Sequence, residues 1–239
     1  MTTTLIVPGL KSSGPTHWQT WLERRTAGSV RVHQRDWNDP HLPDWSSRVR
    51  REIVRASGSV FIVAHSFGAL AAAQAASDHA ERISGMLLVA PADPEVFGVG
   101  EFLPNAPLGF PVIVVASTND PWMPFDTAAA WSRLWGGDLV NLGEAGHINA
   151  EAGFGPWPEG LALLERLRRA SEFKAAAERL AAFNLAQRRP ITRQWLRRST
   201  AHPRTGAKAD ARELKSAATL LLEAGWSVRA PENRHHGAI

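Results

Sequence analysis

The sequence predicts an α/β fold in which a mostly parallel β-sheet carries helices on both faces. The first observation behind this prediction is that short apolar runs, rich in β-branched residues, alternate with helical patterns through residues 1–170. The second is that these runs are apolar at successive positions, as in strands that a parallel sheet buries on both faces. The third is size, because 239 residues allow one large domain with an extension.

The predicted strands are short and end at residues that break β-structure. Pro8-Gly9 ends the first strand, Pro91 stops the fourth, and Asn119-Asp120-Pro121 stops the fifth. Proline cannot donate a backbone hydrogen bond to a neighbouring strand, so these positions limit the sheet. In chain order, the predicted strands are residues 5–7, 30–34, 59–64, 85–90, 111–116 and 139–142.

The predicted helices lie between these strands and carry apolar residues at helical spacing. Trp18 and Leu22 share one side of the first helix, and Val49 and Ile53 face inward from the second, whose arginines point mostly outward. The third helix is rich in alanine. In chain order, the predicted helices are residues 16–26, 44–56, 67–77, 126–135 and 159–169. Ligands of such sheets bind at the C-terminal ends of the strands, so the functional residues are expected in the loops that follow strands.

Charge divides the chain into two parts. Residues 1–170 hold 14 Lys and Arg against 17 Asp and Glu, whereas residues 171–239 hold 13 against 6. The high isoelectric point therefore belongs to the last 69 residues, and the sequence predicts a domain at 1–170 followed by a basic, mainly helical extension at 171–239.

The extension has two interpretations. Its order of helix at 171–201, loop at 202–208, helix at 211–224 and short strand at 226–228 is similar to winged-helix modules, which would allow nucleic-acid contact. The other interpretation, which we favour, is a helical extension with a solvated basic face. The adjacent histidines His235-His236 are only a weak metal signal without further ligands.

Composition excludes several classes of protein. The chain has no cysteine, which removes disulfide frameworks, cysteine zinc sites and thiol nucleophiles. Its longest apolar runs, such as residues 112–116, are far shorter than the roughly 18 residues that a membrane span requires. The N-terminal residues are typical of a strand rather than a signal peptide. We therefore expect a cytoplasmic protein without membrane contact, and nothing in the sequence indicates its oligomeric state.

A serine stands where a strand passes directly into a helix. His65-Ser66-Phe67-Gly68 follows the strand at 59–64 and precedes the alanine-rich helix. Such a sharp turn requires small residues two positions before and after the serine, and here these are Ala64 and Gly68. Alanine replaces the first glycine of the usual G-x-S-x-G pattern. The pattern predicts that Ser66 is a nucleophile, the alternative being an ordinary turn of small residues.

A nucleophilic serine needs a general base and an acid that orients the base. His147 follows the last predicted strand in a glycine-punctuated loop and is the expected base. Asp120, in the loop after the strand at 111–116, is the expected acid, and Asp93, after the preceding strand, is its competitor. The chain order Ser66, Asp120, His147 is that of α/β-hydrolases.

The remaining site residues are expected from the geometry of acyl transfer. The backbone N–H of Phe67 and that of Leu10, in the loop after the first strand, are the expected oxyanion donors. His65 is expected to shape the site while pointing away from the serine. His17 is expected either to line the mouth of the site or to take part in packing, and Trp122 is the tryptophan most expected to face the site.

A larger set of short motifs is spread along residues 3–165. Its members are Val7-Pro8-Gly9, Ser13, His17-Trp18, Trp21, Asp36-Trp37, Pro40, Trp45, His65-Ser66-Phe67-Gly68, Asn119-Asp120-Pro121, Gly146-His147-Ile148-Asn149, Gly153, Gly155, Trp157-Pro158 and Gly160. With these motifs, the sequence resembles the small serine hydrolases of the α/β-hydrolase superfamily that include retinoblastoma-binding protein 9 and its bacterial relatives. The resemblance implies an α/β-hydrolase fold without a lid domain, and it places Ser66, Asp120 and His147 at the family's triad positions. A chain without cysteine lacks the Leu-x-Cys-x-Glu motif of the animal protein, so a retinoblastoma-protein interaction is not implied.

These features predict a serine hydrolase that cleaves small esters or amides through an acyl-enzyme, with no cofactor and no metal. The rival hypothesis is a regulatory or nucleic-acid-binding protein with a hydrolase fold, in which residues 171–239 carry the function.

Overall fold

The computed structural model describes residues 2–187, with side chains described to residue 182. The chain divides into two compact units, Met1–Ser171 and Glu172–Ile239. The first unit holds the sheet, whereas the described part of the second is helical. The expected helix at 211–224, the short strand at 226–228 and His235-His236 lie outside the described residues. No helix in the described part of the chain is long and apolar enough to cross a membrane.

Six strands form one parallel sheet in the order β2-β1-β3-β4-β5-β6. Their bounds are β1 Thr2–Val7, β2 Ser29–Arg31, β3 Ser59–Ser66, β4 Ile83–Pro91, β5 Val112–Ala116 and β6 Asp138–Asn141. From β1 the chain moves outward to β2 and then returns across β1 to β3, from which every later strand is added on the other side. The order of the strands therefore reverses between β1 and β3, and the loops that follow these two strands meet where such sheets bind ligands.

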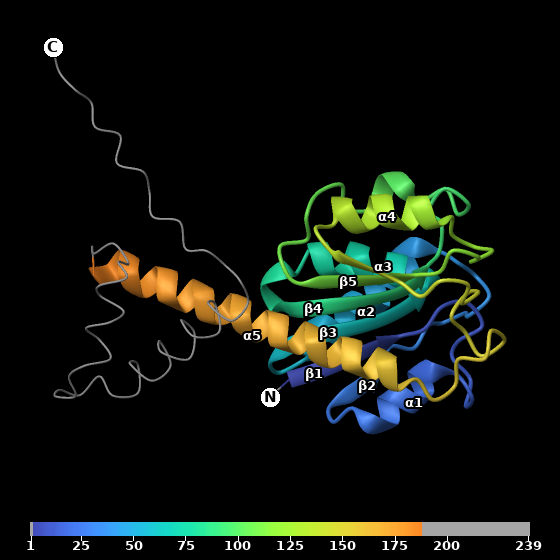
Figure 1. Cartoon of the computed structure of the whole chain (residues 1–239), viewed down its shortest axis with the longest axis horizontal. Helices are drawn as coiled ribbons and strands as arrows, with labels where there is room; N and C mark the ends of the chain where they lie inside the picture. Colours follow the sequence, from blue (N-terminus) through green and yellow to red (C-terminus); the bar gives the residue numbers. More distant parts are fainter. Residues whose placement is uncertain (1, 188–239) are drawn as a thin grey trace, which may run out of the picture. The chain divides into compact units, whose positions relative to one another are not determined.

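Helices cover both faces of the sheet. Their bounds are α1 Trp18–Arg25, α2 Leu42–Arg55, α3 Phe67–Ser77, α4 Phe125–Leu134 and α5 Pro158–Gln187, with short 3₁₀ turns η1 Ala80–Arg82 and η2 Gly100–Phe102. Because side chains alternate along a strand, Leu5 packs with α2 and α3 on one face, whereas Ile6 packs with α1 and the start of α5 on the other. Figure 1 shows α1 and the start of α5 on the side of the sheet opposite α3.

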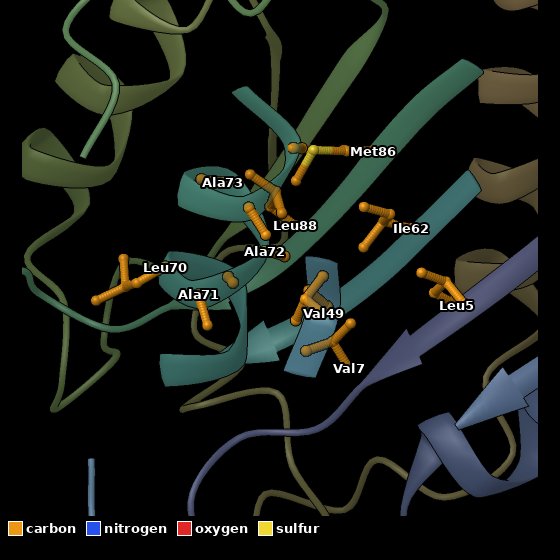
Figure 2. Close-up of a cluster of buried hydrophobic side chains, with 14 of the residues drawn as sticks. Leu5, Val7, Val49, Ile62, Leu70, Ala71, Ala72, Ala73, Met86 and Leu88 are labelled. Carbon is orange, nitrogen blue, oxygen red and sulfur yellow. The ribbon is translucent and has the colours of Figure 1, made fainter. Parts of the chain in front are cut away.

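The alanines of α3 bring this helix close to the sheet. Figure 2 shows Ala71, Ala72 and Ala73 grouped with Ile62 of β3 and Leu88 of β4. These side chains are fully buried. Short side chains shorten the distance between a helix and a sheet, which fixes the start of α3 firmly against β3. The start of α3 is also the point at which Ser66 stands.

The predicted fold class is confirmed, with differences at several boundaries. Residues 30–34 were expected to be extended, but β2 ends at Arg31, although Val32 still donates a backbone hydrogen bond to Ile6 at 2.8 Å. The expected helices at 159–169 and 171–201 are continuous as α5 through Gln187, because no proline or glycine interrupts the backbone between residues 161 and 187. No lid-sized insertion interrupts the sheet within residues 2–171.

Candidate active site

Ser66 occupies a strained turn between β3 and α3. It is the last residue of β3 and the N-cap of α3, with φ 55° and ψ −133°. A positive φ is costly for a residue other than glycine, and it persists where the surrounding structure holds it. Two glycines make that possible. A Cβ at Gly68 would lie 2.2 Å from the carbonyl oxygen of Pro8, and a Cβ at Gly9 would lie 2.6 Å from the Cβ of Ser66.

The structure brings Ser66, His147 and Asp120 into one line of hydrogen bonds. Nε2 of His147 lies 2.9 Å from Oγ of Ser66, and Nδ1 of His147 lies 2.9 Å from each carboxylate oxygen of Asp120. The carboxylate accepts from Nδ1–H, which leaves Nε2 free to accept from the serine hydroxyl. The side chain of Asp120 is 2% exposed and that of His147 is 10% exposed. The carboxylate of Asp120 is therefore largely shielded from water, and its electrostatic interaction with the imidazole of His147 is stronger than it would be at the surface.

Asp93 lies in a different environment. Its Oδ1 accepts a hydrogen bond from the backbone N–H of Glu95 at 3.0 Å, so the carboxylate stabilises its own turn. Its backbone N–H donates to the carbonyl oxygen of Trp122, which joins the loops after β4 and β5. Of the two aspartates considered from the sequence, the structure places Asp120 against His147.

Two residues to which the sequence analysis assigned no role, Ser117 and Asn119, join the loop of Asp120 to the loop of His147. Oδ1 of Asn119 accepts from the backbone N–H of Gly146 at 2.7 Å, and Oγ of Ser117 accepts from the backbone N–H of Ala145 at 2.9 Å. Both acceptors come from the segment just before Asp120. The distance between acid and base is therefore set by these loops as well as by the two side chains.

His65 is in hydrogen-bond contact with the backbone of His147. Its Nε2 lies 2.9 Å from the carbonyl oxygen of His147, and the two rings are 4.9 Å apart. Burial, together with the neighbouring charges of His147 and His17, lowers the pKa of His65 well below its ordinary value. A neutral imidazole facing a carbonyl donates from Nε2–H, so His65 links the strand of the nucleophile to the loop of the base.

His17 is buried and caps α1. Its Nδ1 accepts from the backbone N–H of Gln19 at 3.2 Å, and its ring packs 5.0 Å from that of His65. Burial, followed by the charges of Arg31 and His147, lowers the pKa of His17 to about 4. The side chain is therefore neutral near pH 7, as an acceptor of a helix N–H must be.

The remaining expected residues surround Ser66 and His147. Trp122 is 54% exposed, with its ring 6.4 Å from that of His147, and its backbone N–H donates to Oδ1 of Asp120. Phe67 is the first residue of α3, so its N–H has no acceptor within the helix. Leu10 follows Gly9, whose close approach to Ser66 brings the loop after β1 against the serine. Within residues 2–187, no group of three or more His, Cys, Asp or Glu side chains could hold a metal ion.

The family follows from comparison with known proteins. Residues 4–166 match the family model described as serine hydrolase. The chain belongs to the serine hydrolase family. This assignment makes the protein a hydrolase, and it matches the sheet and the Ser66 turn of the first unit. No curated protein sequence matches the chain.

Solved structures show the same fold in relatives of this serine hydrolase. A structure reported as a YdeN-like hydrolase from Pectobacterium atrosepticum is 44% identical, with a TM-score of 0.67, and the match covers 72% of this chain and 91% of that one. The ydeN gene product of B. subtilis is 20% identical, with a TM-score of 0.59 and coverage of 70% and 98%. Est1E of Butyrivibrio proteoclasticus, solved with ferulic acid, is 16% identical, with a TM-score of 0.52 and coverage of 71% and 87%. The last two likenesses concern the fold alone.

Proposed function

We propose that this serine hydrolase cleaves small carboxylic esters or amides through an acyl-enzyme, with Ser66 as nucleophile, His147 as general base and Asp120 as the acid that orients the base. The observation that carries the proposal is the continuous line of 2.9 Å hydrogen bonds from Oγ of Ser66 through the imidazole to the carboxylate of Asp120. A serine hydroxyl is a weak nucleophile until a base removes its proton during attack, and this arrangement supplies that base.

The reaction would proceed in two halves. Oγ of Ser66 bonds to the substrate carbonyl carbon while Nε2 of His147 takes the hydroxyl proton, and Asp120 stabilises the imidazolium that forms. The leaving alcohol or amine then receives this proton as its bond to the acyl group breaks. Water next attacks the acyl-enzyme with His147 again as base, which releases the acid and restores the serine hydroxyl.

The oxyanion of each tetrahedral intermediate needs two hydrogen-bond donors. The N–H of Phe67 is suited to this role because it stands at the N-terminus of α3, where the helix dipole also favours negative charge. The N–H of Leu10 is the second proposed donor, from a loop that touches Ser66 through Gly9.

The test is Ser66→Ala against a matched control. We expect Ser66→Ala to lower hydrolysis of p-nitrophenyl acetate by about 10⁴-fold or more and to abolish covalent labelling by a fluorophosphonate, since members of a triad act as a unit. Ser47→Ala, on an exposed position of α2, should leave both unchanged. A Ser66→Ala protein that is still labelled or still active would contradict the proposal.

The rival hypothesis of nucleic-acid binding depends on residues 171–239. Residues 188–239 lie outside the described part of the chain, and the observations on the first unit favour hydrolysis. Nucleic-acid contact through the extension therefore stays a prediction.

A further inference from the structure

Gln19 carries a fully buried amide, and no pattern in the sequence singles it out. It is the second residue of α1 and its exposed fraction is 0%. Nε2 of Gln19 donates to the carbonyl oxygen of Val7 at 3.2 Å and to that of Val63 at 3.1 Å, and Oε1 accepts from the hydroxyl of Ser13 at 2.6 Å. A buried amide is costly unless its polar atoms are bonded, so this side chain has one well-defined orientation.

The three partners of Gln19 belong to β1, to the loop after it and to β3. Val7 ends β1 and precedes the loop of Leu10, and Ser13 lies three residues after Leu10 in the same loop. Val63 belongs to β3, three residues before Ser66. One side chain is therefore bonded on either side of the segment that holds Leu10 and also to the strand that presents the nucleophile.

That loop needs such support because its backbone is strained. Lys11 and Ser12 have φ values of 62° and 63°, in the left-handed region that residues other than glycine rarely adopt. The N–H of Ser12 donates to the carbonyl oxygen of Gly9 at 3.1 Å, which closes a tight turn around Leu10. Consecutive strained residues persist only where their surroundings hold them, and the bonds of Gln19 lie at both ends of the turn.

We propose that Gln19 is a positioning residue for the oxyanion hole. Its amide fixes the loop after β1 against β3, so that the N–H of Leu10 and the N–H of Phe67 are directed at the same point beside Ser66. This inference rests on the proposed function. Donors of an oxyanion hole act because they are held in place before charge develops, and displacement of a reacting group by about 1 Å can cost about 10²-fold in rate.

The experiment replaces the amide without changing its size. Gln19→Met keeps the length of the side chain and removes all three hydrogen bonds, whereas Ser13→Ala removes one of them. Gln74→Met is the control, because Gln74 is a partly buried glutamine of α3 whose Nε2 donates to the carbonyl oxygen of Phe102. A separate sample of each protein is labelled to completion with a fluorophosphonate to count its active sites, and kcat of the unlabelled protein for p-nitrophenyl acetate is expressed per site.

A second measurement separates positioning from general stability. Phenylboronic acid forms a tetrahedral adduct when Oγ of Ser66 bonds to boron and His147 takes the hydroxyl proton, and a boron-bound oxygen then occupies the oxyanion position. We expect Gln19→Met to lower kcat per site by roughly 10- to 100-fold and to lower the affinity for phenylboronic acid by a similar factor. Ser13→Ala should lower kcat per site and phenylboronic acid affinity by smaller factors. In the double variant, each quantity should fall by less than the product of the two single effects, because the two residues share one hydrogen bond.

Three outcomes would overturn the inference. They are a kcat per site of Gln19→Met within about twofold of the wild type, a fall in kcat without loss of phenylboronic acid affinity, or an equal loss in Gln74→Met. If Gln19→Met does not fold, Ser13→Ala decides by the same two measurements. Failure of the proposed function would look different, since wild-type protein would then not be labelled at Ser66 at all.

Discussion

Acid should destabilise the folded protein through His17, because folding buries this imidazole in its neutral form. The ordinary pKa of 6.5 falls to about 4 in the folded protein. Between these two values the unfolded chain binds a proton that the folded chain does not. The contribution of His17 to stability is therefore fully present above pH 6.5 and is lost as the pH falls toward 4.

The size of the effect follows from the shift. A difference of about 2.5 pKa units corresponds to about 3 kcal/mol when the loss is complete, and to about 2 kcal/mol at pH 5. Small domains are stable by about 5–15 kcal/mol, so this loss is a substantial part of the whole. His65, whose pKa is also lowered by burial, adds a loss of the same sign.

The assay compares the wild type with His17→Asn. Asparagine can accept the N–H of Gln19 as a helix N-cap but does not titrate, so the cap is kept while the proton-binding group is removed. Urea unfolding, followed by tryptophan fluorescence at intervals from pH 8 to 4.5, gives the free energy of unfolding of each protein. Carboxylates titrate in both, so the difference between the curves isolates His17. We expect the wild type to lose about 2 kcal/mol more than His17→Asn between pH 8 and pH 5, and parallel curves would refute the reasoning.

Three other substitutions test the geometry of the site. Asp120→Asn should lower kcat by about 10⁴-fold because the base loses its orienting acid, whereas Asp93→Asn should change kcat little, and the reverse result would reassign the acid. His65→Gln should retain most activity, since its amide nitrogen can replace Nε2 as donor to the carbonyl of the base, whereas the shorter His65→Asn should lose roughly tenfold in kcat. Equal kcat in these two variants would show that the hydrogen bond is dispensable. Gly68→Ala should lower both the melting temperature and kcat, because its Cβ would meet a backbone carbonyl oxygen at 2.2 Å, and unchanged values would refute the steric argument.

The sheet was predictable from sequence because its strands are buried on both faces. Strands such as β3 and β5 read as unbroken apolar runs, and the burial of nearly every residue in them explains that pattern. Of the two edge strands, β2 was predicted less well than β6, since β2 has only three residues and none of them is fully buried. Burial on both faces constrains composition strongly, whereas a three-residue edge strand satisfies few constraints that a sequence pattern can reveal.

The line of Ser66, Asp120 and His147 was expected from sequence for a different reason. A parallel sheet brings the C-terminal ends of its strands to one edge, so Ser66 at the end of β3 and the loops that follow β5 and β6 must lie near one another. Chain order and loop position then select the side chains. No detailed contact has to be known, because the sheet topology alone places Ser66 near His147. These residues are 81 positions apart in the sequence, yet Oγ of Ser66 and Nε2 of His147 are 2.9 Å apart.

The contacts of the supporting residues could not be predicted in this way because their partners are mainly backbone carbonyls. His65 bonds to the carbonyl oxygen of His147 and Gln19 bonds to those of Val7 and Val63, and every residue type carries the same carbonyl. A hydrogen bond to a backbone carbonyl therefore does not restrict which residue type stands at the position that accepts it. The only local sign at Gln19 is a polar residue beside Trp18 at the start of an amphipathic helix, which is also typical of an exposed position. Gln19 can hold other groups in place only because it is buried, and its burial depends on how α1 packs against β1 and β3. A single sequence thus indicates the reacting groups, whose chemistry restricts the residue type, more readily than the groups that hold them in place.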